Sequence, residues 1–375
     1  MAMQSQALRE AILSLALSHL SLADLSYESA SREARARAIA HLTSAIDSPQ
    51  RNAIWSQENA SACLTLVMGL TTTSNGRGWY SHLQVAAHLI LSAEGIGNES
   101  TSFHGPEYLG QTAEGRCVLR KFAYHDVLGC VTVHTRPLIS PEYIDSISDE
   151  VDSNMGVGTR LLKYIGGIQI LAFESSVQNR EGYSQGWCSD FRRKWTQIEK
   201  DLHDWDCCAA DGEQSIISLA HAYRNAALIL LYRLMARHAN ACLFETLDQS
   251  SDEEPNACDP AANALRLTYM DLLHSKISFQ VSEIMRYISA ISVGSAPEAA
   301  ILFPLFIAGG EAHDQNQQEE IRLRLQQSFA KRNFCNIKSA LEVLENVWRR
   351  ERGAECRLVA WEEVLRELGW EVILT

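Results

Sequence analysis

The sequence has little basic charge for its length. Its 375 residues include 33 lysines and arginines against 46 aspartates and glutamates, which gives a net charge of −13. Nucleic-acid affinity rests on lysine and arginine side chains that neutralise phosphates, and this composition offers no excess of them. We therefore expect no direct nucleic-acid binding by this chain.

Long apolar runs and targeting segments are also lacking. The longest apolar run, "NAALILLY", ends at Arg233, well short of the roughly 20 residues that span a bilayer. The N-terminal "MAMQSQALREAIL" has no basic stretch ahead of an apolar core, as a secretory signal would have. These absences predict an intracellular protein with no membrane segment.

Paired cysteines and the common cofactor motifs are absent as well. None of the ten cysteines forms a CxxC pair, and a chain of this size does not need disulfides, so we expect buried free thiols. The sequence contains no GxSxG elbow, P-loop, GxGxxG or HExxH in a usable context. We therefore expect no nucleotide, flavin or metal cofactor.

Helical periodicity dominates what is present. In "ALREAILSLALSHLSLADL" the spacing predicts an apolar stripe of Leu8, Ile12, Leu15 and Leu22. Longer stretches such as "SIISLAHAYRNAALILLYRLMARHANACLFE" are apolar on most sides, as buried helices are, and no segment alternates as a strand would. The pattern predicts an all-α fold, a single large multi-helix domain over residues 1–375 with a C-terminal subregion at about 297–375. The acidic "DQSSDEEPNACDP" and the Gly/Ser-rich residues 95–115 are expected to be loops.

The stretch "LFPLFIAGGEAHD", residues 302–314, combines an apolar run, a proline, two glycines, Glu311 and His313. The glycines permit a close backbone approach or a break. Glu311 and His313 are two residues apart, which on a helix separates them by about 200°, and zinc-binding helices need a spacing of four. We expect Glu311 to be a buried anchor that is hydrogen-bonded to neighbouring backbone.

An ordered series of motifs resembles one known family. After "ILFPLFIAGGEA" come "EEIRLRLQQSF", "RNFCNIKSALEVLENVWRR" and "AWEEVLRELGWEVIL". This order is similar to the C-terminal signature of the fungal-specific transcription factor domain: an aromatic, Pro-Leu-Phe, Ala-Gly and an acidic residue, then "A…LE.VW" and "W…GW". Upstream, "GWYSHLQVAAHLILSAEG" looks like the family's "W..HL.GA..LL…G", with Val85 where glycine is usual.

The resemblance implies the helical regulatory region that follows a binuclear zinc-cluster DNA-binding module. That module needs six closely spaced cysteines and a basic linker, and this sequence has neither. The chain is therefore expected not to bind DNA by the family's route. It is either a piece of a regulator or a free-standing protein, and Met1 favours the second.

Buried polar groups in apolar helices are the candidate site residues, because burial is costly unless such groups are partnered. On the longest helix, His221, Arg224 and Tyr232 share one broad face, which lines either an internal cavity or a hydrogen-bonded seam between helices. Arg224 needs a carboxylate, a set of carbonyls or a ligand group, with Asp126 and Glu174 as candidate protein partners.

Four further positions in the N-terminal half are candidates for a pocket or for a structural role. His125 is a candidate pocket residue, whereas Asp126 beside it matches the family pattern and is expected to be structural. Trp79 and His82 also match that pattern, which suggests packing.

We therefore carry a first functional hypothesis: a free-standing protein of fungal secondary metabolism that binds a hydrophobic small molecule. Such a protein could be a cofactor-independent cyclase, isomerase or Diels–Alder-type pericyclase, with His221, Arg224, Tyr232 and His125 as catalytic candidates. The alternative is a ligand-sensing regulatory domain of a fungal zinc-cluster transcription factor, and a third possibility is a purely structural interaction partner. The first would be cytoplasmic and the second nuclear.

Overall fold

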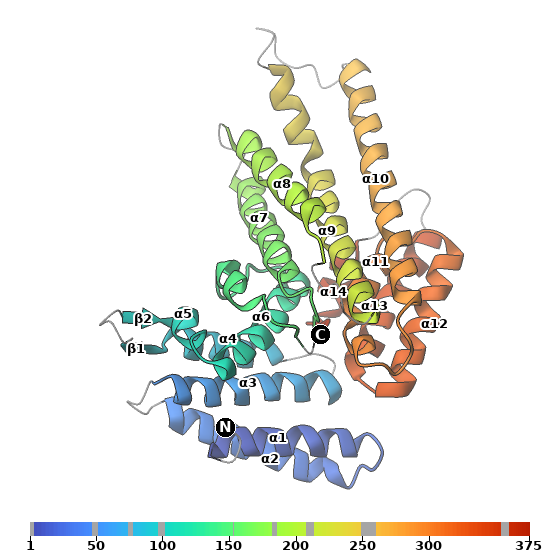
Figure 1. The fold of residues 1–375 in the computed structure, drawn as a ribbon. Helices are drawn as coiled ribbons and strands as arrows, with labels where there is room; N and C mark the ends of the chain where they lie inside the picture. The colour runs from blue at the N-terminus through green and yellow to red at the C-terminus, as the bar shows by residue number, and fades with distance from the viewer. Residues whose placement is uncertain are drawn as a thin grey trace.

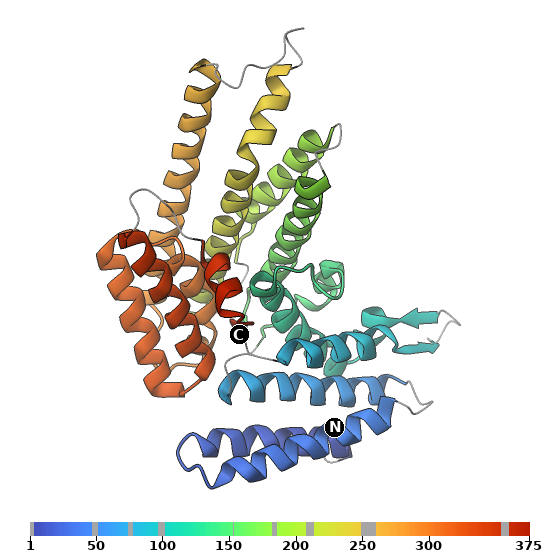
Figure 2. The same cartoon turned by 180° about the vertical axis from the view of Figure 1, so that it is seen from behind.

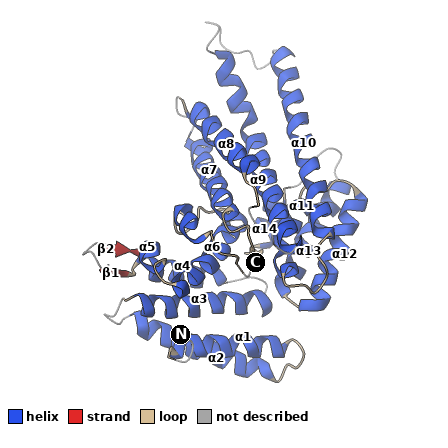
Figure 3. Cartoon of the chain, viewed as in Figure 1, coloured by secondary structure: helices blue, strands red, loops and turns tan. Residues whose placement is uncertain are grey.

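The structure is a computed structural model. It describes residues 4–46, 52–73, 78–96, 102–152, 154–181, 186–207, 214–248, 260–353 and 360–375. Helices make up nearly all the regular structure of these ranges, so the all-α prediction is confirmed (Figure 3). The expected acidic loop at residues 248–260 lies almost wholly outside the described residues.

The first three helices stack as a layer at one end of the molecule (Figure 1). These are α1 (Gln6–Ser21), α2 (Tyr27–Ile46) and α3 (Ala53–Thr73). Apart from Leu8, the face that α1 buries is made of small residues, such as Ala11 and Ser18, and Ser18 Oγ lies 2.7 Å from Ser31 Oγ of α2. The predicted stripe was wrong in part, because Ile12 is 43% exposed: close helix contact selects small side chains here, not large ones.

A short antiparallel hairpin follows α4 (Trp79–Leu91). Strands β1 (Glu94–Ile96) and β2 (Ser102–His104) pair with Gly95 opposite Phe103, and α5 (Gly105–Leu109) comes next. The sequence analysis expected only a loop here. Three-residue strands are too short to show an alternating pattern, which explains why they were missed.

Helix α6 (Ala113–Val133) runs through the middle of the molecule and is buried along most of its length. Beyond the 3-10 helix η1 (Pro141–Ile147), four long helices rise together from the centre in both views (Figures 1 and 2). They are α7 (Leu161–Glu181), α8 (Trp187–Asp204), α9 (Gln214–Asp248) and α10 (Pro260–Ser289). Helix α9 packs against the other three, so it is buried on nearly every side between residues 219 and 235.

The C-terminal elements lie against the base of α9 and α10. They comprise the 3-10 helix η2 (Pro297–Ala300), α11 (Leu302–Gly309), α12 (Gln315–Arg332), α13 (Cys335–Gly353) and α14 (Trp361–Leu368). Every residue of α11 is buried, as its apolar sequence predicts. The C-terminal subregion that was expected to begin at about residue 297 stays a prediction. Helix α11 within it packs directly on α9.

The segment after α14 joins two hydrophobic clusters. Val372 and Leu374 belong to the larger cluster built on α6–α14, while Ile373 between them belongs to the N-terminal cluster built on α1–α6. Hydrogen bonds fix this extended segment from both sides: Trp79 Nε1 donates to the Glu371 carbonyl at 2.7 Å, and Asn336 Nδ2 donates to the Thr375 carbonyl at 2.8 Å. Residues 371–375 therefore tie the two halves of the core together.

Seven cysteines lie within the described residues, and all seven are free thiols. Four of them are buried, namely Cys63, Cys130, Cys188 and Cys242. Burial raises the pKa of the Cys63 thiol to about 12, so this thiol is protonated and unreactive at neutral pH.

Candidate functional site

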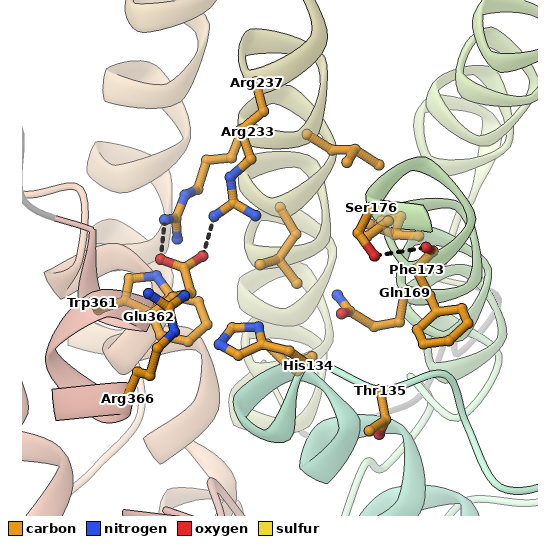
Figure 4. Close-up of a pocket in the computed structure, with 15 residues that line it drawn as sticks. His134, Thr135, Gln169, Phe173, Ser176, Arg233, Arg237, Trp361, Glu362 and Arg366 are labelled. Atoms are coloured by element: carbon orange, nitrogen blue, oxygen red, sulfur yellow. Dashed lines mark hydrogen bonds and ion pairs between the residues drawn. The ribbon is translucent and has the colours of Figure 1, made fainter. Parts of the chain in front are cut away.

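A cleft of about 340 Å³ opens where the C-terminal end of α6 meets α7, α9 and α14 (Figure 4). This volume lies at the lower end of the range for small-molecule sites, roughly 300–1,000 Å³. Charged side chains from α9 and α14 gather on one wall, and α7 supplies an uncharged wall opposite. The cleft is lined by Val131, His134, Thr135, Ile168, Gln169, Ala172, Phe173, Ser176, Leu230, Arg233, Leu234, Arg237, Trp361, Glu362 and Arg366.

Arg233 is the centre of the charged wall. Its guanidinium is only 10% exposed and pairs with two carboxylates: Nε lies 3.0 Å from Glu311 Oε1, and Nη2 lies 2.7 Å from Glu362 Oε2. Arg237, one helical turn later, pairs with the other oxygen of Glu362. Arg233 Nη1 is buried and has no hydrogen-bond partner, so the cluster leaves one donor unsatisfied.

The two carboxylates around Arg233 have opposite pKa shifts. Burial would raise the pKa of Glu362, but Arg233 and Arg237 lower it to about 2. Burial raises the pKa of Glu311, and Arg233 offsets this only in part. Burial likewise would lower the pKa of Arg233, but Glu311 and Glu362 hold it above its usual value. Glu362 is therefore the firmly ionised partner of both arginines at neutral pH.

An aromatic stack lies beside the charged wall. Trp361, at the start of α14, stacks on His134 with ring centroids 5.9 Å apart, and the Arg233 guanidinium lies 5.1 Å from the Trp361 ring. His134 ends α6 in the left-handed region, with φ 54°, which terminates the helix at this point. Trp361 Nε1 is buried without a partner, a second unsatisfied donor beside the cleft.

Residues 302–314 pack against the residues of this wall. A side chain at Gly310 would place its Cβ 2.5 Å from Trp361 Cδ1, and one at Gly309 would meet Leu344 at 2.6 Å, so both positions require glycine. The glycines were expected to permit a close backbone approach or a break, and both occur: Leu344 and Trp361 lie close to them, and α11 ends at Gly309. Glu311 is largely but not fully buried, with its side chain 16% exposed, and its described partner is the Arg233 side chain, not neighbouring backbone. The correction has a simple cause: α11 packs against α9, where Arg233 needs a carboxylate.

The opposite wall comes from one face of α7. Gln169 is 8% exposed, and its side-chain amide makes no hydrogen bond to any described residue. Figure 4 shows this amide directed across the cleft toward the charged wall. Phe173, one turn further on, is 36% exposed although it is large and apolar. An amide without a described partner beside a partly exposed aromatic ring is typical of a surface that contacts a ligand.

The structure places His221, Arg224 and Tyr232 away from this cleft. His221 stacks on Tyr287 of α10 with centroids 4.8 Å apart, and burial lowers its pKa. Arg224 Nε donates to the Leu202 carbonyl at 2.7 Å, which satisfies the end of α8. Tyr232 packs between α8 and α10, where the Lys276 ammonium lies 4.8 Å from its ring centre.

Each proposed protein partner of Arg224 was wrong. Asp126 accepts backbone N–H bonds from Leu138 at 2.9 Å and Ile139 at 3.3 Å, and Glu174 pairs with Lys194. The structural role predicted for Asp126 is thereby confirmed. Backbone carbonyls were among the alternatives. The carbonyls of Leu202 and His203 accept the hydrogen bonds of Arg224, because α8 ends beside it.

His125 is also a structural contact in this conformation. Its Nδ1 lies 2.9 Å from Thr375 Oγ1, and burial lowers its pKa to about 3, so the ring is neutral. The packing role expected for Trp79 is confirmed by its full burial and by its bond to the Glu371 carbonyl. Whether His221, Arg224, Tyr232 or His125 takes part in catalysis stays a prediction.

The sequence analysis missed every residue of the charged wall except Glu311. A usable signal was present: Arg233 and Arg237 are one turn apart on a long, largely apolar helix, where a buried cation needs an anionic partner. What could not be seen was which carboxylate this would be. The "AWEEVL" segment carries two glutamates, and only the crossing of α14 with α9 selects Glu362.

Two further features bear on the kind of site. Over the ranges described above, no group of three or more His, Cys, Asp or Glu side chains is arranged to hold a metal ion. Within those same ranges, no helix combines the length and the apolar character needed to cross a membrane.

Comparison with known proteins gives one match. The profile of the family described as "Fungal specific transcription factor domain" matches residues 1–375, the whole chain. Neither a curated protein nor a solved structure matches it. The match covers the helical fold, the glycine joint of α11 and the α14 segment that carries Trp361 and Glu362. This chain therefore belongs to the fungal-specific transcription factor domain family.

Proposed function

We propose that this chain is a regulatory region that controls transcription in response to an apolar small molecule, and that the cleft beside α14 receives this molecule. The family membership supports the regulatory role, which was the alternative at the level of sequence. The observation that carries the ligand site is the unsatisfied polarity around one hollow: Arg233 Nη1, Trp361 Nε1 and the Gln169 amide have no described partner.

The location of the cleft suits a sensor. Three segments far apart in the sequence meet there: the end of α6, the middle of α9 and α14. Helix α14 leads directly into residues 371–375, which contact both halves of the core. A molecule that shifts α14 therefore alters contacts with the N-terminal layer as well.

The proposal places the protein in the nucleus, where a transcription regulator acts. DNA contact would come from another segment or another chain, since this one carries a net charge of −13. The cyclase or pericyclase reading receives no support from the described contacts, because its four candidate residues do not meet at one site.

A tethering experiment tests the regulatory role. The chain is fused to a heterologous DNA-binding module, and transcription of a reporter with the matching operator is measured in a fungal host. We expect output to differ from that of the module alone and to change when Ala172→Phe fills the cleft. Equal output from all three proteins at equal abundance would contradict the proposal.

A further inference from the structure

We infer that the ligand of this cleft is a monoanion with an apolar body, namely a carboxylate held at the mouth by Arg366 and Arg237. This inference rests on the proposed function, because it names the chemical class of the molecule that the same site receives.

The charge balance of the wall favours an anionic ligand. Arg233, Arg237 and Arg366 supply three positive charges, whereas Glu311 and Glu362 supply two negative ones. The nearby imidazole of His134 adds none, because burial, with the help of Arg237 and Arg366, lowers its pKa. The wall therefore has one uncompensated positive charge, which a monoanion would balance.

One cation of the wall has no partner among the described residues. Arg233 and Arg237 are both engaged by Glu362. The Arg366 side chain is exposed at the cleft mouth and has no ion pair or hydrogen bond with the described part of the chain. Arg237 is 49% exposed, so part of its guanidinium stays accessible beside the Glu362 pair. Both guanidinium groups line the cleft and present the planar donors that carboxylates accept.

The apolar part of the cleft indicates that the body of the ligand is apolar. Apolar side chains also line the hollow, namely Ile168, Ala172 and Phe173 of α7 and Leu230 and Leu234 of α9. Phe173 is 36% exposed. An apolar chain or ring would cover this surface and gain about 25 cal/mol for each Å² removed from water. The Gln169 amide lies within this wall and offers a hydrogen bond to a polar group on the ligand body.

The overall charge of the chain does not oppose this inference. Although the net charge is −13, exposed charges are screened beyond roughly 8 Å at physiological salt. The local arginines therefore decide whether an anion binds in the cleft. Exposed carboxylates further along the surface have little effect on it.

Calorimetric titration of the purified chain with octanoate and with octanamide tests the inference. The two probes share an apolar chain and differ in head-group charge. We expect octanoate to bind at least tenfold more tightly than octanamide. Arg366→Gln should weaken octanoate about tenfold and leave octanamide unchanged, while the charge-matched Arg32→Gln on α2 should change neither.

The outcomes separate this inference from the proposed function. Equal binding of octanoate and octanamide, or no binding of octanoate, would overturn the carboxylate assignment, yet the tethered reporter would still respond to Ala172→Phe if the domain regulates transcription. Octyl phosphate binding tenfold more tightly than octanoate would overturn the monoanionic head group. Arg366 is exposed, so its variant is expected to fold, and an unchanged thermal midpoint would verify this.

Discussion

Arg233 of α9 and Glu362 of α14 form a buried ion pair at 2.7 Å although 129 residues separate them in the chain. The pair closes the back of the cleft and fixes the first turn of α14 against α9. Because Glu362 also pairs with Arg237, one carboxylate serves two neighbouring cations of α9. The stability of this corner of the fold should therefore depend strongly on Glu362.

We expect Glu362→Gln to lower the free energy of unfolding by about 3 kcal/mol, because it removes the counter-charge that two arginines share and leaves the buried Arg233 with Glu311 alone. Urea denaturation followed by circular dichroism measures the change. Glu367→Gln on the same helix is the matched control, since Glu367 is 58% exposed in its pair with Arg350. That change should cost at most about 1 kcal/mol. Similar losses in both variants would contradict the central role of Glu362.

The same carboxylate predicts a pH dependence. The pKa of Glu362 is lowered from 4.5 to about 2 in the folded chain, so its contribution is fully present above about pH 4.5. It is lost as the pH falls from 4.5 toward 2, where the folded-state carboxylate also becomes protonated. We expect the stability difference between wild type and Glu362→Gln to shrink over this window. A difference that stays constant from pH 6 to pH 2.5 would refute it.

Glu311→Ala should destabilise the fold by roughly 1–3 kcal/mol, because it removes the carboxylate that partners Arg233 Nε. Thermal unfolding monitored by circular dichroism measures this. The sequence predicted the same direction, with backbone donors as the partners left unpaired. A variant with an unchanged thermal midpoint would show that Arg233 does not need Glu311.

The contact of α13 with residues 371–375 predicts a second weak point. Asn336 Nδ2 donates to the carbonyls of Ile373 at 3.1 Å and Thr375 at 2.8 Å. Asn336→Ala should cost about 1–3 kcal/mol in the free energy of unfolding, since buried carbonyls lose their donor. Asn346→Ala on the same helix is the control, because its amide lies at an exposed position, where it donates to the Glu342 carbonyl and accepts from Arg349 Nη1. Equal effects would exclude a special role for the terminal segment.

Arg224→Gln separates packing from function. Its guanidinium bonds to the Leu202 and His203 carbonyls, so we expect a loss of about 1 kcal/mol in stability and no change in octanoate affinity. Denaturant titration and calorimetry on the same protein measure the two quantities. A folded Arg224→Gln protein that no longer binds octanoate would return this residue to the functional site.

Local sequence information determined the fold class and much of its detail. Helical periodicity and the ordered motifs indicated the helices and the family, and the two glycines of residues 302–314 indicated either a close backbone approach or a break. These features depend on spacing within a few turns, which is why sequence alone was sufficient. The hairpin of β1 and β2 was missed because three residues per strand carry too little pattern.

Only the tertiary structure decided which polar groups meet. Periodicity placed Arg224 on a polar face of α9, but whether a face meets a cavity or the end of another helix depends on how helices cross. The crossing of α9 with α8 gave Arg224 two backbone carbonyls, and its crossing with α11 and α14 gave Arg233 two carboxylates. The sequence by itself thus determined the helices and their family, and long-range packing selected the cleft, since a partner 129 residues away leaves no local trace.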